Sequence, residues 1–430
     1  MRRVVVLGAG LTGLSAARNL AGAGVDAVVL EREMEPGGVC RTLREGPFSF
    51  DLTGHLLHLS RDDSSEVLAG LGVLPALARH RRRAGIALGG AVTPYPIQIH
   101  THRLPRAIRR DCVLGFVEAR LRGDDGAEPA SFADWVARRF GDGFARHFFL
   151  PYNGKLFCTD PAELTTEWVG RYVPRPRLAD VIDGAFGLYR RPVGYNATFL
   201  YPRRGGIDVL ARALAGGVPS LRTGCEVVAV DLDAGRLTLA GGETLEWDDL
   251  VATAPLTHLA AMTSGLPPDA RRAAGKLRSV GVVNVNLAVR GPAPRREHWL
   301  YVPEERYPFY RVGFPSNHGS VAPNGFHTVS VEVSVRSGEP APPDLEEACM
   351  EGLGDLGLLR DRVAVERVVT VRIDPAYVVF DRPRAAAVAA LRRAYRARGV
   401  LLAGRWAEWK YSTMEDALWD GATAARRLVR

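Results

Sequence analysis

A glycine-rich turn directly after a short apolar run constrains this 430-residue chain more than any other feature. Residues 4–7 are the continuous apolar run of a buried parallel strand, and Gly8-Ala9-Gly10-Leu11-Thr12-Gly13 follows at once. The first two glycines permit a tight turn and a close approach of backbone to a pyrophosphate, and the third lets helix and strand pack. A second apolar run, 27–30, ends at Glu31, the acid that would bind ribose hydroxyls. The pattern predicts a dinucleotide-binding strand–helix–strand unit.

The rest of the chain indicates several further structural regions, since 430 residues exceed what one hydrophobic core usually organises. Residues 104–172 are mostly helical in pattern, which predicts an inserted helical lobe. Alternating apolar and polar residues at 282–289 and 328–335 predict a half-buried antiparallel sheet that forms a separate substrate wall. Further strands are expected at 226–230, 237–239, 250–253 and 400–403, and a final helix at 414–428.

Composition bounds the location and the ligands of the protein. The chain enters its first strand without an apolar leader, so we expect a cytoplasmic protein. No apolar run is long enough to cross a bilayer, and no membrane insertion is expected. Five cysteines lie far apart without metal-ligand spacing, which indicates reduced thiols and no metal site. The net charge of +8 comes from scattered arginines and favours an anionic small molecule over a nucleic acid. The sequence leaves a homo-oligomer open.

Four dispersed segments resemble the superfamily of FAD-dependent amine oxidases and protoporphyrinogen oxidases. Gly37-Gly38-Val39-Cys40-Arg41 resembles its second glycine turn, and Glu226-Val227 resembles its adenine-side strand, followed by a similar segment at 249–256. Gly404-Arg405, ahead of Met414-Glu415-Asp416, resembles the closing motif in which a helix N-terminus meets the pyrophosphate. The resemblance implies bound FAD, with cofactor contacts from Gly8, Gly10, Gly13, Glu31, Arg32, Gly38, Arg41, Val227, Gly404, Arg405, Met414 and Asp416.

The resemblance also implies the fold class. We expect an α/β protein with a discontinuous, Rossmann-like FAD-binding domain of the type that carries this double glycine signature, an antiparallel-sheet substrate domain and an inserted helical lobe. The expected bounds are 1–75, 200–260 and 396–430 for the FAD-binding domain, 76–100 and 261–395 for the substrate domain, and 101–199 for the helical lobe.

Within that superfamily the substrate segments are most similar to the eukaryotic-type branch of the UDP-galactopyranose mutases. The matching stretches are Phe50-Asp51-Leu52-Thr53-Gly54-His55, Thr93-Pro94-Tyr95-Pro96-Ile97-Gln98, Tyr152-Asn153-Gly154-Lys155-Leu156-Phe157, 167–171, 199–206, 299–318 and Trp409-Lys410-Tyr411. The resemblance implies catalytic roles for His55, Arg171, Arg311, Tyr377 and Tyr411. It implies substrate contacts from Tyr95, Gln98, Asn153, Phe157, Asn196, Tyr310 and His318.

The chemistry of a nucleoside-diphosphate sugar fits these residue types. Arg171 and Arg311 would bind the diphosphate through forked, charge-assisted hydrogen bonds, and tyrosine hydroxyls would donate to the same oxygens. Tyr95 offers an aromatic face to a base, and Gln98 offers both a donor and an acceptor to its edge. The family usually has an aromatic residue at the position of Ile97, a tryptophan at that of Phe157 and a tyrosine at that of His318, so the base and the sugar are left open.

The implied activity is a mutase that interconverts the pyranose and furanose forms of a nucleoside-diphosphate sugar without net redox change. N5 of reduced flavin would attack the anomeric carbon and expel the nucleoside diphosphate. The sugar ring of the adduct would then open and close again through O4, and the diphosphate would return to the anomeric carbon and release the flavin. An external reductant such as NAD(P)H would reduce the flavin. The alternative is an oxidase or desaturase of the same superfamily, but arginines buried against a hydrocarbon substrate would be costly.

Overall fold

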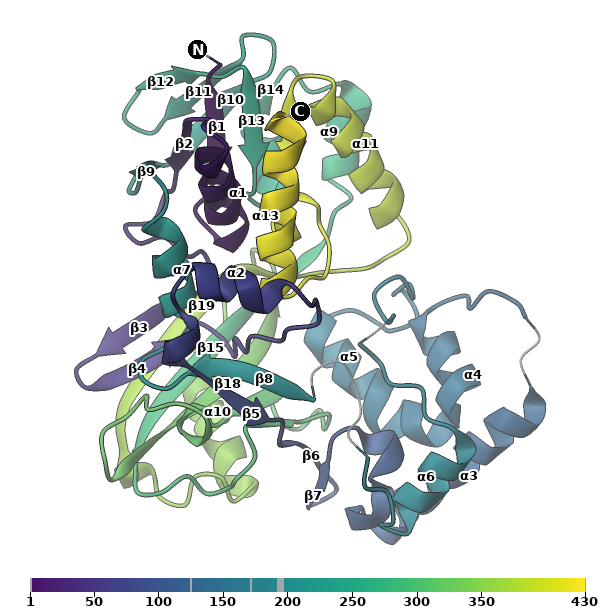
Figure 1. Cartoon of the computed structure of the whole chain (residues 1–430). Helices are drawn as coiled ribbons and strands as arrows, with labels where there is room; N and C mark the ends of the chain where they lie inside the picture. Colours follow the sequence, from purple (N-terminus) through teal and green to yellow (C-terminus); the bar gives the residue numbers. More distant parts are fainter. Residues whose placement is uncertain (1, 124–125, 171, 192–196, 430) are drawn as a thin grey trace.

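The computed structural model describes residues 2–123, 126–170, 172–191 and 197–429, and Figure 1 shows their arrangement. A parallel sheet with the two chain ends lies at one end of the view, a large mixed sheet lies below it, and a helical lobe extends to the side. This α/β architecture confirms the expected fold class.

Five strands form the parallel sheet in the order β20-β13-β1-β2-β9. They are β1 (Val4–Leu7), β2 (Ala27–Leu30), β9 (Ser220–Arg222), β13 (Asp249–Ala252) and β20 (Val400–Leu402). Every residue of β1 is buried, as expected for a central strand covered on both faces. A second sheet, β12-β11-β10-β14, joins β10 (Val227–Asp231), β11 (Arg236–Leu239), β12 (Thr244–Glu246) and β14 (Thr263–Ser264).

Helix α1 (Leu11–Gly22) packs closely against both β1 and the last helix, α13 (Met414–Val429), which lie side by side with it in Figure 1. A Cβ at Gly13 would lie 1.9 Å from the carbonyl oxygen of Gly8, so only glycine lets α1 approach the turn after β1. A Cβ at Gly421 would lie 2.3 Å from the carbonyl oxygen of Thr12. The two glycines therefore fix how near α1 lies to the first strand and to the end of the chain.

A seven-stranded mixed sheet has the order β19-β15-β18-β17-β16-β6-β7. Its strands are β6 (Ala84–Leu88), β7 (Ala91–Pro94), β15 (Ser279–Arg290), β16 (Trp299–Tyr301), β17 (Arg311–Gly313), β18 (Phe326–Arg336) and β19 (Val365–Val378). The expectation of a half-buried sheet is wrong at its centre, because residues 280–289 of β15 are all buried. Val283, Val285 and Val289 of β15 and the valines of β18 pack with α10 (Leu345–Asp355) in one core cluster, while polar residues between them, such as Asn284 and Ser330, face the interior of the protein.

The helical lobe contains α3 (Arg106–Arg122), α4 (Phe132–Phe144), α5 (Leu150–Phe157) and α6 (Leu178–Ala185). Helices α3 and α4 cross closely, since a Cβ at Gly143 would lie 2.1 Å from the carbonyl oxygen of Asp111. Phe132, Trp135 and Phe140 fill the space between these helices and the rest of the protein.

The remaining elements are two-stranded ribbons and short helices that connect these layers. They are β3 (Thr42–Glu45) with β4 (Phe48–Asp51), β5 (Leu77–Arg81) with β8 (Thr198–Pro202), α2 (Ser64–Gly70), α7 (Asp208–Ala215), α8 (Leu256–Ala261), α9 (Pro268–Ala274), α11 (Arg384–Arg396) and α12 (Gly404–Ala407). Among the described residues, no helix combines the length and the apolarity needed to cross a membrane. The domain bounds given above stay a prediction.

Replacing Gly421 by alanine should destabilise the contact between α1 and α13, because the added methyl group would meet backbone atoms of α1. We expect a loss of about 1 to 3 kcal/mol in the free energy of unfolding, measured by urea denaturation, together with weaker retention of FAD. Gly22→Ala is the matched control in α1, since a Cβ there has no described atom within 4 Å and should be neutral or stabilising. Equal stability of the two variants would contradict the close crossing.

Candidate functional site

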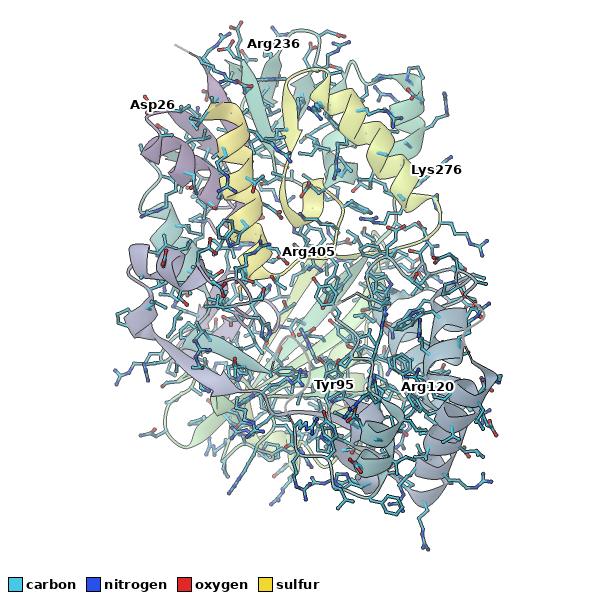
Figure 2. The ribbon with its side chains drawn as sticks, turned by 45° about the vertical axis from the view of Figure 1, so that its right-hand side comes forward. Asp26, Tyr95, Arg120, Arg236, Lys276 and Arg405 are labelled. Carbon is cyan, nitrogen blue, oxygen red and sulfur yellow. The ribbon has the colours of Figure 1, made fainter. Side chains whose placement is uncertain are left out.

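One cavity of about 960 Å³ lies between the parallel sheet and the seven-stranded sheet. Its upper wall is formed by the turns that follow β1, β2, β13 and β20. These turns meet at one edge because the strands are parallel, and this edge is where ligands bind in open α/β sheets. Figure 2 labels Arg405, from the turn after β20, near the middle of the molecule. The lower wall comes from the seven-stranded sheet and residues 50–56.

The glycine turn after β1 combines tight packing with open space. Gly8 has a φ of +100°, a conformation that favours glycine, and its Cβ would lie 2.5 Å from Oγ1 of Thr253. Gly10 lines the cavity, and a Cβ at this position would have no described atom within 4 Å. The backbone at Gly10 and the N-terminus of α1 are therefore accessible to an anionic ligand in the cavity.

The carboxylate of Glu31 is held at the end of β2 by two backbone donors. Its Oε2 accepts a hydrogen bond from the amide of Ala9 at 2.7 Å, and its Oε1 accepts one from Glu33 at 3.1 Å. The residue is buried but lines the cavity. A carboxylate accepts about four hydrogen bonds, so two acceptor positions remain for ribose hydroxyls.

Arg405, at the start of the short helix α12, contributes a guanidinium to the cavity wall. Its Nη atoms donate to the carbonyl oxygens of Ser412 and Ala376, both at 3.0 Å, while its buried Nε has no partner among the described residues. The guanidinium lies 5.2 Å from the ring centroid of Tyr377 and 5.1 Å from that of Tyr411. These rings and carbonyls hold the cation against the cavity.

These features fit FAD. A glycine turn without side chains, a helix N-terminus and an anchored acid match the pyrophosphate and the adenosine ribose of a dinucleotide. Of the residues expected to bind the cofactor, Gly8, Gly10, Glu31, Arg32, Gly38, Arg41, Val227, Gly404, Arg405 and Met414 line the cavity. Gly13 packs on Gly8 instead, and Asp416 accepts hydrogen bonds from the backbone amide and hydroxyl of Thr413 at the start of α13.

A buried acid organises the lower end of the cavity. Glu332, on β18, pairs with the guanidinium of Arg311 and accepts a hydrogen bond from the hydroxyl of Tyr310. It also accepts a hydrogen bond from the backbone amide of Gly54, the residue before His55, at 3.1 Å. Burial opposes the charge on Arg311, but Glu332 outweighs it and raises the pKa of Arg311 further above its usual range. Arg311 thus stays charged. Glu332 binds one Nη of its guanidinium, and the side chain lines the cavity.

Several tyrosine side chains gather around Arg311. The hydroxyls of Tyr152, Tyr377 and Tyr411 have no hydrogen-bond partner among the described residues. Burial raises the pKa of Tyr377 to about 12, and the positive charge of Arg311 opposes this rise. The Tyr377 hydroxyl therefore keeps its proton at neutral pH and can donate a hydrogen bond, as can that of Tyr152, whose pKa burial also raises. Tyr377 and Tyr411 line the cavity, so together with Arg311 they can donate several hydrogen bonds to an anion.

His55 lines the cavity in the loop after β4. Its Nδ1 lies 3.2 Å from both Oγ1 and the carbonyl oxygen of Thr53. Burial lowers the pKa of His55 to about 4, so the imidazole is neutral at pH 7. A neutral imidazole can donate or accept one hydrogen bond in the cavity without adding charge.

Lys155 fixes the loop that carries much of this site. Its Nζ donates to the carbonyl oxygens of Val302 at 3.0 Å, Glu304 at 2.6 Å and Phe309 at 3.1 Å. The segment it ties down runs from β16, which ends at Tyr301, to Arg311 at the start of β17. Burial lowers the pKa of Lys155 to about 8, and its three carbonyl partners take up all of its donors.

The other expected substrate residues have different surroundings. His318 lines the cavity, whereas Tyr95, Gln98, Asn153, Phe157 and Tyr310 are not part of its wall. The amide of Gln98 donates to the carbonyl oxygen of Pro174 at 3.1 Å, and that of Asn153 donates to Phe149 at 2.8 Å. Arg171 and Asn196 lie outside the described residues. The substrate roles of these residues stay predictions.

Sequence reasoning missed Glu332 and Tyr301. Both line the cavity, and the ring of Tyr301 lies 5.1 Å from that of Tyr95. A signal for Glu332 was present, because it lies on the polar side of an alternating strand together with Ser330. The alternation does not show whether that side of the strand faces water or a cavity, and in the structure it faces the cavity.

Comparisons with known proteins give a family and three similar proteins of different named activities. A family model described as flavin containing amine oxidoreductase matches residues 11–429. The crystal structure of a reduced UDP-galactopyranose mutase is similar over 100% of this chain and 96% of that chain, with a TM-score of 0.94 and 28% identity. The crystal structure of a putative protoporphyrinogen oxidase from an Exiguobacterium species is also similar, with a TM-score of 0.76 over 100% of this chain and 98% of that chain. At 17% identity this likeness shows the fold alone. In sequence, an all-trans-zeta-carotene desaturase of Myxococcus xanthus is 26% identical over 396 residues, 79% of this chain and 70% of the relative.

Two alanine substitutions in the glycine turn should separate cofactor binding from folding. Gly10→Ala adds a methyl group that points into the cavity, so we expect FAD affinity to fall about tenfold or more, or about 1.4 kcal/mol, with the melting temperature of the apoprotein nearly unchanged. Gly13→Ala places a methyl group on the carbonyl of Gly8 and should destabilise the apoprotein itself. FAD fluorescence titration and thermal melting of the apoprotein measure the two effects. Unchanged FAD affinity in Gly10→Ala would contradict this position of the cofactor.

Proposed function

The chain belongs to the flavin containing amine oxidoreductase family and so is an FAD-dependent protein, and on this premise we propose that it is a mutase acting on a nucleoside-diphosphate sugar. The reaction would interconvert the pyranose and furanose forms of the sugar. The residues around Arg311 carry the proposal, because a charged guanidinium and the tyrosine hydroxyls on the same cavity wall would suit an anion beside the expected FAD site.

The diphosphate would bind to Arg311 and the neighbouring tyrosines. Glu332 takes one Nη of the guanidinium, and the remaining N–H groups of Arg311 can reach diphosphate oxygens. The hydroxyls of Tyr377 and Tyr411 would add neutral donors. These groups would hold the diphosphate while it is bonded to the sugar and also after the bond breaks, which keeps the leaving group in place for its return.

The cofactor side would position the sugar. Reduced FAD, when bound, supplies an electron-rich nucleophile, and NAD(P)H is the class of reductant that would keep it reduced. The glycine turn after β1 and Glu31 would hold its adenosine diphosphate part, and neutral His55 would hydrogen-bond in the cavity without changing its charge. Tyr95 and Gln98 remain proposed for the base, and Arg171 for the diphosphate.

An oxidase or desaturase is the second candidate, because the curated relative in sequence is named a carotene desaturase. Such an enzyme would need a wall that accepts an apolar substrate. The charged Arg311 with its buried partner Glu332, and hydroxyls without protein partners, would be costly to cover with hydrocarbon. The likeness to a mutase over the whole length of the chain also supports the first candidate.

Removing single hydroxyls should reveal the diphosphate site without unfolding the protein. We expect Tyr377→Phe and Tyr411→Phe each to lower kcat/KM by about tenfold to a hundredfold, since a hydrogen bond to a charged group contributes about 1.5 to 3 kcal/mol. FAD content and melting temperature should stay unchanged, because these hydroxyls have no partner among the described residues. The measurements are steady-state kinetics and thermal melting.

Tyr395→Phe is the matched control. The hydroxyl of Tyr395 lies 3.0 Å from that of Thr263, away from the cavity, so its removal should lower stability and leave kcat/KM unchanged. If Tyr377→Phe and Tyr411→Phe behave like this control, the two tyrosines are structural and the diphosphate site is not here.

The reaction class can be tested with oxygen excluded. We expect dithionite-reduced protein to convert the pyranose form of a UDP-linked sugar to the furanose form over many turnovers. No further reductant should be consumed, because an isomerisation transfers no net electrons. Chromatography of the sugar nucleotides and absorbance of the flavin follow the two quantities. A desaturase or oxidase would instead need oxidised flavin and one equivalent of acceptor for each turnover. Turnover that depends on an added acceptor would overturn the mutase proposal.

A further inference from the structure

An exposed apolar tip lies at the outer end of the helical lobe, after α6. Phe186 and Leu188 are 75% and 63% exposed, although neither belongs to the cavity. In Figure 1 the helix lies at the lower edge of the lobe, away from the parallel sheet. Two large apolar side chains this exposed within three residues are unusual for a solvated loop and indicate a contact surface.

The tip is anchored by the residues that alternate with this pair. A Cβ at Gly187 would lie 3.4 Å from the ring of His102, and the ring of Tyr189 packs edge-on to that of His100 with centroids 6.0 Å apart. Backbone hydrogen bonds close the turn, from Leu188 to the carbonyl of Asp183 at 2.8 Å and from Phe186 to that of Ile182 at 3.2 Å. The inward residues therefore hold Phe186 and Leu188 in fixed outward positions.

Three arginines lie near His102, the residue that packs beneath Gly187 of the tip. Arg103, Arg109 and Arg190 converge on His102, and their positive charges add to burial in lowering the pKa of that histidine. Arg190 donates to the carbonyl oxygen of Gly187 at 2.6 Å and Arg109 to that of His102 at 3.3 Å, which leaves N–H groups of both free for other acceptors. The acids on α6 are Asp180, which pairs with Arg177, and Asp183. Arg103 also interacts with the carboxylate of Glu297, so the excess of positive charge at the tip comes mainly from Arg109 and Arg190.

We propose that this tip, residues 186–190 with Arg103 and Arg109, binds the surface of a membrane that contains anionic phospholipids. Phe186 and Leu188 would enter the boundary between headgroups and acyl chains, and the arginines would bind lipid phosphates, which is the pairing of apolar and basic residues found in interfacial anchors. The contact is peripheral and needs no membrane-spanning helix. It is independent of the reaction proposed above.

Other partners fit this surface less well. A second copy of the chain, related by a twofold axis, would bring arginines against arginines, which is unfavourable. Single-stranded nucleic acid is bound on successive aromatic platforms along a basic groove, whereas this tip pairs one phenylalanine with a leucine. An acidic protein remains as an outcome that the experiment separates from lipid.

Flotation of the FAD-loaded chain with vesicles tests the proposal. We expect binding to phosphatidylcholine vesicles that contain about one third phosphatidylglycerol, and none to pure phosphatidylcholine or at about 1 M salt. Phe186→Ser with Leu188→Ser should weaken binding about tenfold or more. Arg103→Gln with Arg190→Gln should weaken it about 25-fold, at about fivefold for each arginine.

Val363→Ser with Arg396→Gln is the matched control. Val363 is 90% exposed and Arg396 lies on α11, far from α6 in Figure 1, so binding should be unchanged. All variants should keep their FAD content and their activity on soluble substrate, since the altered residues do not line the cavity. Equal binding by the tip variants and the control, or no binding of the natural chain to anionic vesicles, would overturn the proposal. So would loss of self-association in the tip variants without an effect on flotation.

Discussion

The close approach of α1 to the turn after β1 is the constraint on which the rest of the structure depends. A single carbonyl oxygen, that of Gly8, would lie 1.9 Å from any Cβ at Gly13, and the backbone of Thr12 would lie 2.3 Å from one at Gly421. Because both glycines are present, α1 lies close to the parallel sheet and its N-terminal residues line the cavity. The same approach brings α13, and with it the turn after β20, to the pyrophosphate side of the site.

The lower half of the site depends on charge instead of close packing. Glu332 is surrounded by the donors of Gly54, Tyr310 and Arg311, which come from two segments far apart in the sequence. A buried carboxylate needs such partners, and here they place a guanidinium and neutral His55 on the cavity wall. The mutase proposal rests on this arrangement, since the fold alone also serves oxidases.

Sequence reasoning predicted the parts of the structure that are set by local chemistry. The glycines at 8, 10 and 13, the acid at 31 and the strands around them follow from backbone sterics within short segments, and the structure has them where they were expected. It was wrong about the central sheet, since alternation in β15 and β18 shows that two environments exist but not whether the polar one is water or a cavity. Glu332 was missed for the same reason. The partners of Gln98 and Asn153 could not be predicted either, because a backbone carbonyl leaves no signal in the sequence.

The parallel sheet joins the two ends of the chain, and this has a consequence for biosynthesis. Strand β1 lies beside β13, which lies beside β20, so the first strand shares a sheet with residues synthesised almost 400 positions later. Contacts of such long separation form slowly, because the intervening chain must first be ordered. On the ribosome the glycine turn is made almost 400 residues before the segment that carries Arg405. The nascent chain therefore has an open dinucleotide site throughout the synthesis of the residues between them, and a product that stops before Gly404 lacks one wall of that site.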